Sequence, residues 1–242
     1  MSIAEPPPNA GHVVYPESDG EPMADNTKQL RWIVVLFGNL AALFRDRADV
    51  FVAANLNWYP VEGLSAVRIA PDVLVVFGRP KGDRGSYKQW EEGNVPLTVV
   101  FEILSPSNTV MEMDDKLDFY EEHGVEEYYV YDPDSNRLKA FVRQGDVLRR
   151  VRPVNNFVSP RLGIRFDLSG AEMVVYWPDG RPFLTFEELE VARAQAEQRA
   201  DRAEQRAVRL AELSRKARHG QATAEELQEL DRLEEQCRPG SP

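Results

Sequence analysis

The chain has 242 residues, of which 43% are hydrophobic and 29% charged. This balance is typical of a soluble globular protein with one sizeable core and an appendage. A net charge of −11 argues against a surface that attracts nucleic acid by charge alone. The longest clean apolar run, residues 32–37, is far shorter than the ~20 residues that span a bilayer, and residues 1–12 lack the pattern of a secretion signal. The single cysteine, Cys237, excludes an internal disulfide, so we expect a cytoplasmic protein without a membrane span.

The N-terminal part of the chain predicts a flexible lead followed by a helix. Residues 1–24 are rich in proline and polar turn residues, with a short extended piece at 12–15. Residues 25–27 offer helix N-cap candidates, and the helix is expected from about 28 to 45. Its apolar positions have helical spacing, so one face should pack on a sheet: Leu30, Ile33, Val34, Phe37, Leu40, Ala41 and Phe44.

Short apolar runs bounded by turn residues predict the sheet. Runs rich in β-branched residues, such as 73–77 and 97–104, are typical of strands buried on both faces. Residues 78–93 have no apolar periodicity and predict a mobile loop, whereas 111–123 predict a helix ended by Gly124. The fold class is therefore a mixed α/β sheet with extra antiparallel strands at its end. The expected strands are 49–59, 68–77, 97–104, 127–132, 138–142, 147–151, 164–168 and 173–177.

The composition changes after Gly180, which divides the chain into a lead (1–24), a domain (25–180) and a helical tail (181–242). The tail has a net charge of −2, so the first 180 residues carry −9. Thr223 and Glu226 form a capping-box pattern that opens a second short helix. We expect residues 186–236 to contact a second copy or a partner protein. The long first helix carries a weak heptad of Phe186, Leu189, Arg193, Ala196, Ala200, Ala203, Ala207, Leu210, Ser214 and Ala217.

Two acids in the sheet-forming region indicate chemistry. Asp72 opens one predicted strand, and Glu102 lies inside another that is otherwise apolar. Burying an unpaired charge costs roughly several kcal/mol, so each acid needs a partner. Two carboxylates at neighbouring strand ends can hold Mg²⁺ or Mn²⁺, and a lysine such as Lys116 can position the attacking water. Alternatively, Asp72 could only bond backbone N–H groups, and Lys116 could only pair with Glu112 on its own helix.

The motifs of this region resemble the Uma-type endonucleases, a bacterial branch of the PD-(D/E)xK restriction-endonuclease-like superfamily. The resemblance covers about residues 15–177 and rests on Pro71-Asp72, on Glu102-Ile-Leu-Ser-Pro-Ser, and on Lys116 followed by Tyr120 and Gly124-Val-Glu-Glu-Tyr-Tyr-Val-Tyr-Asp-Pro. It implies a restriction-endonuclease-like core, metal dependence and DNA cleavage, with Asp72 and Glu102 as metal ligands and Lys116 as a catalytic residue. The superfamily's lysine position is Leu104 here, so Lys116 on the next helix is the candidate. Many relatives carry an acid or histidine on the first helix, where Gln29 is the nearest polar match.

Two functional hypotheses remain open. The first is an Mg²⁺- or Mn²⁺-dependent endonuclease acting on DNA, with Lys81, Arg84, Lys88 and Gln29 contacting substrate, although the loop cations are also ordinary solvated residues in composition. The second is a catalytically weak or inactive nuclease-fold protein that binds a partner through its C-terminal helices. An acyl or ester hydrolase lacks the required nucleophile elbow and a suitably spaced histidine.

Overall fold

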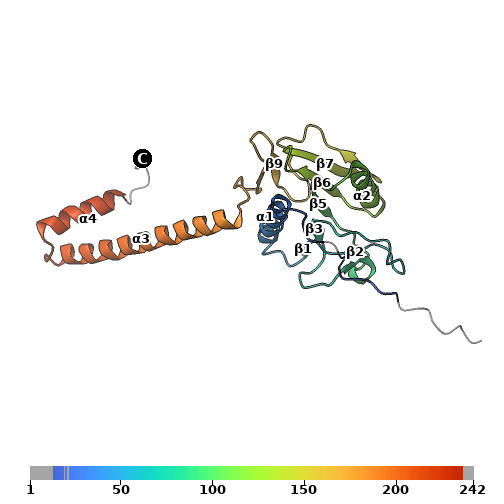
Figure 1. Cartoon of the computed structure of the whole chain (residues 1–242). Helices are drawn as coiled ribbons and strands as arrows, with labels where there is room; N and C mark the ends of the chain where they lie inside the picture. The colour runs from blue at the N-terminus through green and yellow to red at the C-terminus, as the bar shows by residue number, and fades with distance from the viewer. Residues whose placement is uncertain (1–12, 19, 21, 237–242) are drawn as a thin grey trace, which may run out of the picture. The chain divides into compact units, whose positions relative to one another are not determined.

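The computed structural model describes residues 13–18, 20 and 22–236, and the chain divides into two units, residues 1–185 and 186–242 (Figure 1). The first unit is a mixed α/β domain, which confirms the predicted fold class. Its main sheet has six strands, and β5 and β6 are its only parallel neighbours among the described residues. In spatial order the strands are β1 (Val50–Ala54), β3 (Val73–Phe77), β5 (Val99–Ile103), β6 (Glu127–Asp132), β7 (Arg137–Gln144) and β8 (Val147–Arg150).

Helices cover both faces of this sheet. Helix α1 (Thr27–Leu43) packs on one face, and α2 (Val110–Glu122), which connects the parallel strands, packs on the other (Figure 1). Strand residues alternate between the two cores, because successive side chains of a strand point to opposite faces. Val73 and Val75 lie in the α1 core, whereas Leu74 and Val76 lie in the α2 core. The predicted burial of these strands on both faces is confirmed.

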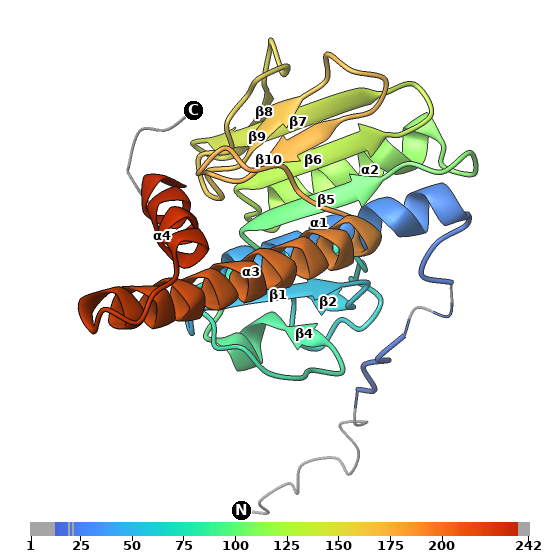
Figure 2. The same cartoon turned by 90° about the vertical axis from the view of Figure 1, so that its left-hand side faces the viewer.

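Two small sheets complete the domain. Strands β9 (Arg165–Asp167) and β10 (Val174–Tyr176) form a separate antiparallel pair rather than extending the main sheet (Figure 2). Residues 78–93, predicted to form a mobile loop, contain β4 (Tyr87–Lys88), which pairs with β2 (Trp58–Tyr59), and the 3-10 helix η1 (Gln89–Glu92). Tyr87 explains the difference: its ring is fully buried, and its hydroxyl donates to the Val95 carbonyl at 2.8 Å. One buried aromatic anchor therefore orders a segment that has no apolar periodicity.

Helix α1 begins as predicted, and its predicted buried face is confirmed only in part, at Ile33, Leu40 and Phe44. The Asn26 side chain accepts from the Gln29 backbone N–H at 2.9 Å and forms the N-cap. Leu30, Val34 and Phe37, predicted to be buried, are 40%, 49% and 38% exposed. Trp32 and Leu36, which also have helical spacing, face the core instead. Apolar residues on two overlapping stripes made the buried face ambiguous from sequence.

Part of the predicted flexible lead is attached to the domain. The Pro16 carbonyl accepts hydrogen bonds from Asn57 and from the Tyr59 hydroxyl, and the Tyr15 ring packs against Tyr59 and Trp90. Residues 13–18 therefore contact the β2 region. The remainder of the predicted lead, residues 1–12, 19 and 21, lies outside the described residues.

The second unit consists of two helices, as predicted, with α3 at Phe186–Arg218 and α4 at Ala224–Gln236. The capping box is confirmed, because the Thr223 hydroxyl accepts from the Glu226 backbone N–H while the Glu226 carboxylate accepts from the Thr223 N–H. Ion pairs join Arg209 to Glu229 and Lys216 to Glu226 across the helices. Leu213, which lies outside the predicted heptad, is fully buried.

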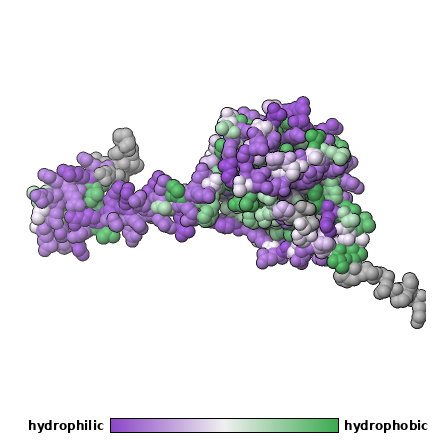
Figure 3. Space-filling model, in the orientation of Figure 1, coloured by the Kyte–Doolittle hydropathy of each residue, from purple (hydrophilic) through white to green (hydrophobic). Residues whose placement is uncertain are grey.

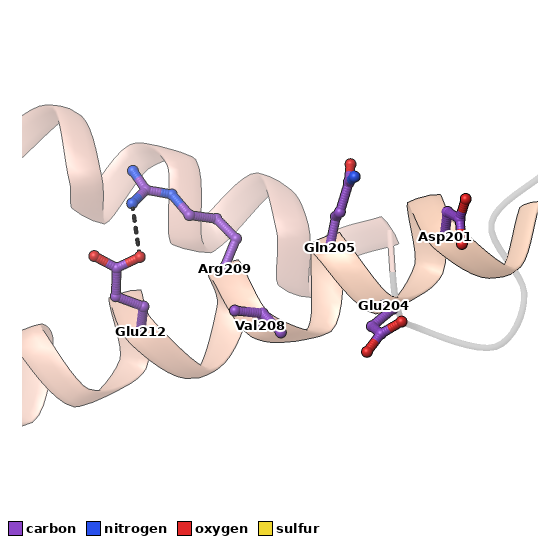
Figure 4. Close-up of a pocket in the computed structure, with 6 residues that line it drawn as sticks. All are labelled: Asp201, Glu204, Gln205, Val208, Arg209 and Glu212. Carbon is purple, nitrogen blue, oxygen red and sulfur yellow. Dashed lines mark hydrogen bonds and ion pairs between the residues drawn. The ribbon is translucent and has the colours of Figure 1, made fainter. Parts of the chain in front are cut away.

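The surface of this second unit is largely polar. Figure 3 colours most of α3 and α4 as hydrophilic, with isolated hydrophobic residues. No helix in the described part of the chain is long and apolar enough to cross a membrane. A shallow cavity of about 410 Å³ on α3 is lined mainly by charged and polar side chains (Figure 4): Asp201, Glu204, Gln205, Val208, Arg209 and Glu212.

Candidate active site

The two predicted acids meet on the face of the sheet that α2 covers. Val73 pairs with Phe101 in the antiparallel β3–β5 ladder, so the same register sets Asp72 beside Glu102. Both acids have the strand parity of Leu74 and belong to the α2 side. Asp72 is 9% exposed and Glu102 is 3% exposed. The fold therefore places two carboxylates together in a largely dry environment.

Helix α2 supplies the partners of Glu102. Lys116 Nζ donates to Glu102 Oε2 at 2.9 Å, and the Tyr120 hydroxyl donates to Glu102 Oε1 at 2.5 Å. Lys116 and Tyr120 are four residues apart, which puts them on one face of the helix. Lys116 also lies 3.8 Å from Glu112, so the same-helix pair exists but is the longer of the two. Both oxygens of Glu102 are thus held by donors from α2.

Asp72 has no cation in hydrogen-bond contact among the described residues. Its Oδ2 accepts from the Ile103 backbone N–H at 2.6 Å. Burial and then the nearby charge of Glu102 raise the pKa of Asp72 to about 8. Burial alone would lower the pKa of Lys116, but Glu102 and Asp72 offset this effect and raise it. Lys116 therefore stays a cation between two acids.

The start of α1 borders the same site. Gln29, buried in the first turn, donates from Nε2 to the Ile103 carbonyl at 2.9 Å. Asp25, just before the helix, accepts hydrogen bonds from the hydroxyls of Ser105 and Ser107, which lower its pKa. These serines, in the turn after β5, thus tie that turn to the entry of α1.

Tyr128 on β6 leaves a polar atom unused near the acids. Its hydroxyl is buried without a hydrogen-bond partner in the described part of the chain. Burial raises the pKa of Tyr128, and the charges of Glu102 and Asp72 raise it further, which shows that the hydroxyl lies within electrostatic reach of the pair. A buried hydroxyl without a partner is uncommon in a folded protein.

The three loop cations predicted to contact substrate have other partners. Lys81 donates to the carbonyls of Phe44 and Arg45 just beyond the C-terminal end of α1, whereas the acids lie near its N-terminal end. Arg84 bonds Glu92, and Lys88 pairs with Glu91. A 17-residue helix is about 25 Å long, so Lys81 is remote from the acid pair. Of the four predicted substrate contacts, the structure brings only Gln29 to the acids.

The donor chemistry of the site fits a hard divalent cation. No three His, Cys, Asp or Glu side chains of the described residues lie close enough to hold one metal ion. Mg²⁺ and Mn²⁺ are nevertheless bound by one or two carboxylates plus water and substrate oxygens. Asp72 and Glu102 bring two buried carboxyl groups together beside one cation, Lys116. The residues present therefore offer oxygen ligands, and a bound cation would favour the ionised form of Asp72, whose pKa is raised in its absence.

Comparison with known proteins identifies the family. The family model of Uma2, described as a putative restriction endonuclease, matches residues 14–173. The chain belongs to the Uma2 family. The Uma2 match contains the whole six-stranded sheet, α1, α2 and the three residues Asp72, Glu102 and Lys116. It ends before the helices of the second unit.

One solved structure similar to this Uma2 chain is that of a putative nuclease belonging to DUF820 from Anabaena variabilis. The two are 14% identical, with a TM-score of 0.44, over 59% of this chain and 79% of that chain. No curated protein matches the chain.

Sequence reasoning found the acids of this Uma2 domain but missed part of their surroundings. Tyr120 was absent from the predicted site, although its four-residue spacing from Lys116 places it on the same helix face. Asp25 and Tyr128 were also missed. Asp25 precedes α1 and resembles any helix-capping residue, and Tyr128 is one of several tyrosines in β6. Only contacts between distant parts of the chain show that Tyr120 bonds Glu102 and that Asp25 bonds the serines after β5.

Proposed function

We propose that this chain is a divalent-metal-dependent endonuclease that hydrolyses phosphodiester bonds of DNA. The observation that carries the proposal is the meeting of Asp72, Glu102 and Lys116 from β3, β5 and α2 on one side of the sheet. Membership of the Uma2 family supports a nuclease in general terms. Metal dependence and the choice of DNA are the parts that we add.

Each residue has a role that follows from its contacts. Asp72 and Glu102 would hold Mg²⁺ or Mn²⁺, which when bound polarises a phosphoryl oxygen and lowers the pKa of a coordinated water. Lys116 offers a fixed positive charge that offsets negative charge developing on the phosphorus oxygens. Tyr120 and Lys116 together fix both oxygens of Glu102, so its carboxylate keeps one orientation.

The test is cleavage of supercoiled plasmid and of single-stranded DNA with Mg²⁺ or Mn²⁺. Asp72→Ala and Glu102→Ala should each lower the rate by roughly a hundredfold or more, because each removes a ligand. Asp118→Ala is the matched control, since Asp118 is an exposed acid on α2. Unchanged cleavage in both site variants would refute the proposal, and RNA cleavage without DNA cleavage would refute the substrate.

A second candidate function is a nuclease-fold protein with weak or no catalysis that binds a partner through α3 and α4. The specific observation in its favour is the absence of a third acid from the acid pair within the described residues, with the amide Gln29 in its place. Calorimetry separates the two functions. No heat of binding with millimolar Mn²⁺ would favour the partner-binding protein, whereas saturable binding that Glu102→Ala abolishes would favour the nuclease.

A further inference from the structure

We propose that three exposed cations at one end of the sheet, Lys139 on β7, Arg150 on β8 and Arg152 just after it, bind the phosphate backbone of DNA beside the acid pair. These three residues are called the cationic strip below. The inference rests on the proposed function, because it takes DNA as the substrate, and it adds the residues that hold that substrate.

The β7–β8 hairpin is the basic part of an acidic chain. Residues 137–152 contain six lysines and arginines and one acid, a net charge of +5, whereas the whole chain carries −11. Many basic side chains elsewhere in the first unit pair with acids, as Arg31 does with Glu172. The side chains of the cationic strip are exposed and form no ion pair or hydrogen bond with another described residue. Their positive charge is therefore available to an anionic partner.

The cationic strip has the same strand parity as the acid pair. Phe141 on β7 and Leu148 on β8 contribute to the core on the α2 side, whereas Val151 contributes to the core on the α1 side. Successive side chains of a strand point to opposite faces, and each residue of the strip is an even number of positions from Phe141 or Leu148. The strip and the two acids therefore belong to the same face of the sheet.

The strand register aligns part of the strip with Glu102. Glu102 pairs with Val130, and Val130 pairs with Lys139. A backbone hydrogen bond of 2.8 Å continues the β7–β8 ladder past β8, which sets Arg152 beside Lys139. Neighbouring strands lie about 4.8 Å apart, so the Cα atoms of Lys139 and Arg152 are roughly 10 Å and 14 Å from that of Glu102.

The charges around the strip favour an approach of DNA over β7 and β8. The exposed side of α2 carries Asp114, Asp115 and Asp118, which repel phosphate groups. Arg137 shares the face of the strip but lies directly across from Asp132, so its charge is offset there. A polyanion that reaches the acid pair along this face is therefore attracted by the strip and repelled by the surface of α2.

The spacing of the strip suits a nucleic-acid backbone. Lysine and arginine side chains donate to phosphate oxygens, and each strand of duplex DNA carries one phosphate per ~3.4 Å of helix axis. The separations of roughly 10 Å and 14 Å from Glu102 correspond to phosphates about three and four nucleotides from the one at the acids. Contacts of this kind position the backbone without reading bases, so we expect little dependence on DNA sequence.

The experiment is a titration of the full chain into a short fluorescent DNA duplex, followed by anisotropy at several salt concentrations. A chelator prevents cleavage, so the measurement does not depend on the metal. Replacing all three residues of the strip by glutamine should raise the Kd roughly a hundredfold. The slope of log K against log salt concentration should become shallower by about three, since each lost phosphate contact removes about one.

Arg149 provides the matched control. It is an exposed arginine of the same hairpin without an ion pair among the described residues, but it lies between Leu148 and Arg150 and so has the opposite parity. Arg150→Gln should raise the Kd about fivefold and reduce the salt slope by about one, whereas Arg149→Gln should change the Kd by less than about twofold.

Each outcome decides the inference. Equal effects of Arg149→Gln and Arg150→Gln would show that the net charge of the hairpin matters rather than its face, and would overturn the inference. An unchanged Kd in the triple variant would overturn it too, and so would a natural sequence that binds phosphatidylserine vesicles but no DNA. In all these cases metal-dependent plasmid cleavage would leave the proposed function standing, whereas the absence of both binding and cleavage would overturn both.

A second measurement uses only the natural sequence and so does not depend on the folding of a variant. In the isotope-labelled protein, the side-chain resonances of Arg150 and Arg152 should shift as unlabelled duplex is added, while those of Arg149 stay in place. Unchanged resonances of Arg150 and Arg152 at saturating DNA, or equal shifts at Arg149, would contradict the proposed binding surface.

Discussion

Two buried carboxylates on neighbouring strands, Glu102 on β5 and Glu127 on β6, have opposite kinds of surroundings. Glu127 is 1% exposed, and its oxygens accept from the hydroxyls of Tyr129 and Ser159 and from the Arg161 backbone N–H. All of these donors are neutral. Glu102 is bonded by a lysine and lies beside a second buried acid. Burial alone therefore does not distinguish a site from a structural anchor.

The hydrogen-bond donors around each acid distinguish the structural anchor Glu127 from the candidate site at Glu102. Neutral hydroxyl and N–H groups satisfy Glu127 and attach the 159–161 turn to β6, which is what a structural acid does. The Asp72–Glu102 pair places two buried carboxyl groups together, so that ionising Asp72 costs free energy unless a ligand offsets it. An arrangement that stabilises the fold poorly and gathers groups from three elements is typical of a functional site.

The largest expected effect on stability is at the structural acid. Glu127→Ala leaves two hydroxyls and one N–H without their acceptor, so the free energy of unfolding should fall by about 4 kcal/mol, since each buried unsatisfied group costs ~1–3 kcal/mol. Urea denaturation measures it. Glu126→Ala is the control, because Glu126 pairs with Arg161 at the surface and should change stability by less than ~1 kcal/mol. Loss of Mn²⁺ binding in a folded Glu127→Ala protein would contradict the comparison.

Asp72, the proposed metal ligand, should behave in the opposite way. In the folded, metal-free protein the pKa of Asp72 is raised from 3.8 to about 8, so its ionisation opposes folding increasingly as the pH rises from 4 to 8. Asp72→Asn removes that cost and should stabilise the protein at pH 8, by on the order of 3 kcal/mol, and hardly at pH 4. Urea denaturation with a chelator at both pH values measures this. An equal effect at pH 4 and pH 8 would show that ionisation is not the cause.

Replacing Lys116 should lower the stability of the metal-free protein but raise its affinity for Mn²⁺. Lys116→Met removes the only cation bonded to Glu102 in the described part of the chain, so the metal-free protein should lose about 2 kcal/mol, a value reduced because Lys116 is partly exposed. Mn²⁺ should bind several-fold more tightly, since a positive neighbour of the ion is gone, while DNA cleavage is lost. Lys28→Met, which affects an exposed pair with Asp134, should change none of these. Weaker Mn²⁺ binding in Lys116→Met would contradict the electrostatic argument.

Local sequence patterns were sufficient to predict most elements of the fold and the two acids. A carboxylate within an apolar strand, as at Glu102, is costly enough to be conspicuous, and Pro71 marks the start of the strand that Asp72 opens. The capping box at Thr223 depends only on residues three positions apart, so it could be predicted in detail.

Features that depend on distant contacts could not be predicted. Sequence spacing does not show which stripe of α1 is buried, and Leu30 and Val34 proved to be on the exposed one. It also does not separate Glu127 from Glu102, because the serine that satisfies Glu127 lies 32 residues away. The partners of the loop cation Lys81 could not be predicted for the same reason. Its ammonium group donates to the carbonyls of Phe44 and Arg45, which lie 37 and 36 residues away in the sequence.

The smallest effect on the domain is expected from deleting residues 186–242. All residues of both hydrophobic cores lie between Trp32 and Phe183, so the domain should keep its thermal midpoint within ~2 °C and its Mn²⁺ affinity. The effect should appear in assembly instead. Phe186 and Leu189, the apolar residues that open the heptad on α3, are 67% and 52% exposed, and apolar heptad positions are buried when helices pair. Sedimentation should give an oligomer for the full chain and a monomer after deletion. Monomers in both cases would assign these helices to a different protein, and a large fall in the midpoint would show that the domain depends on them for its core.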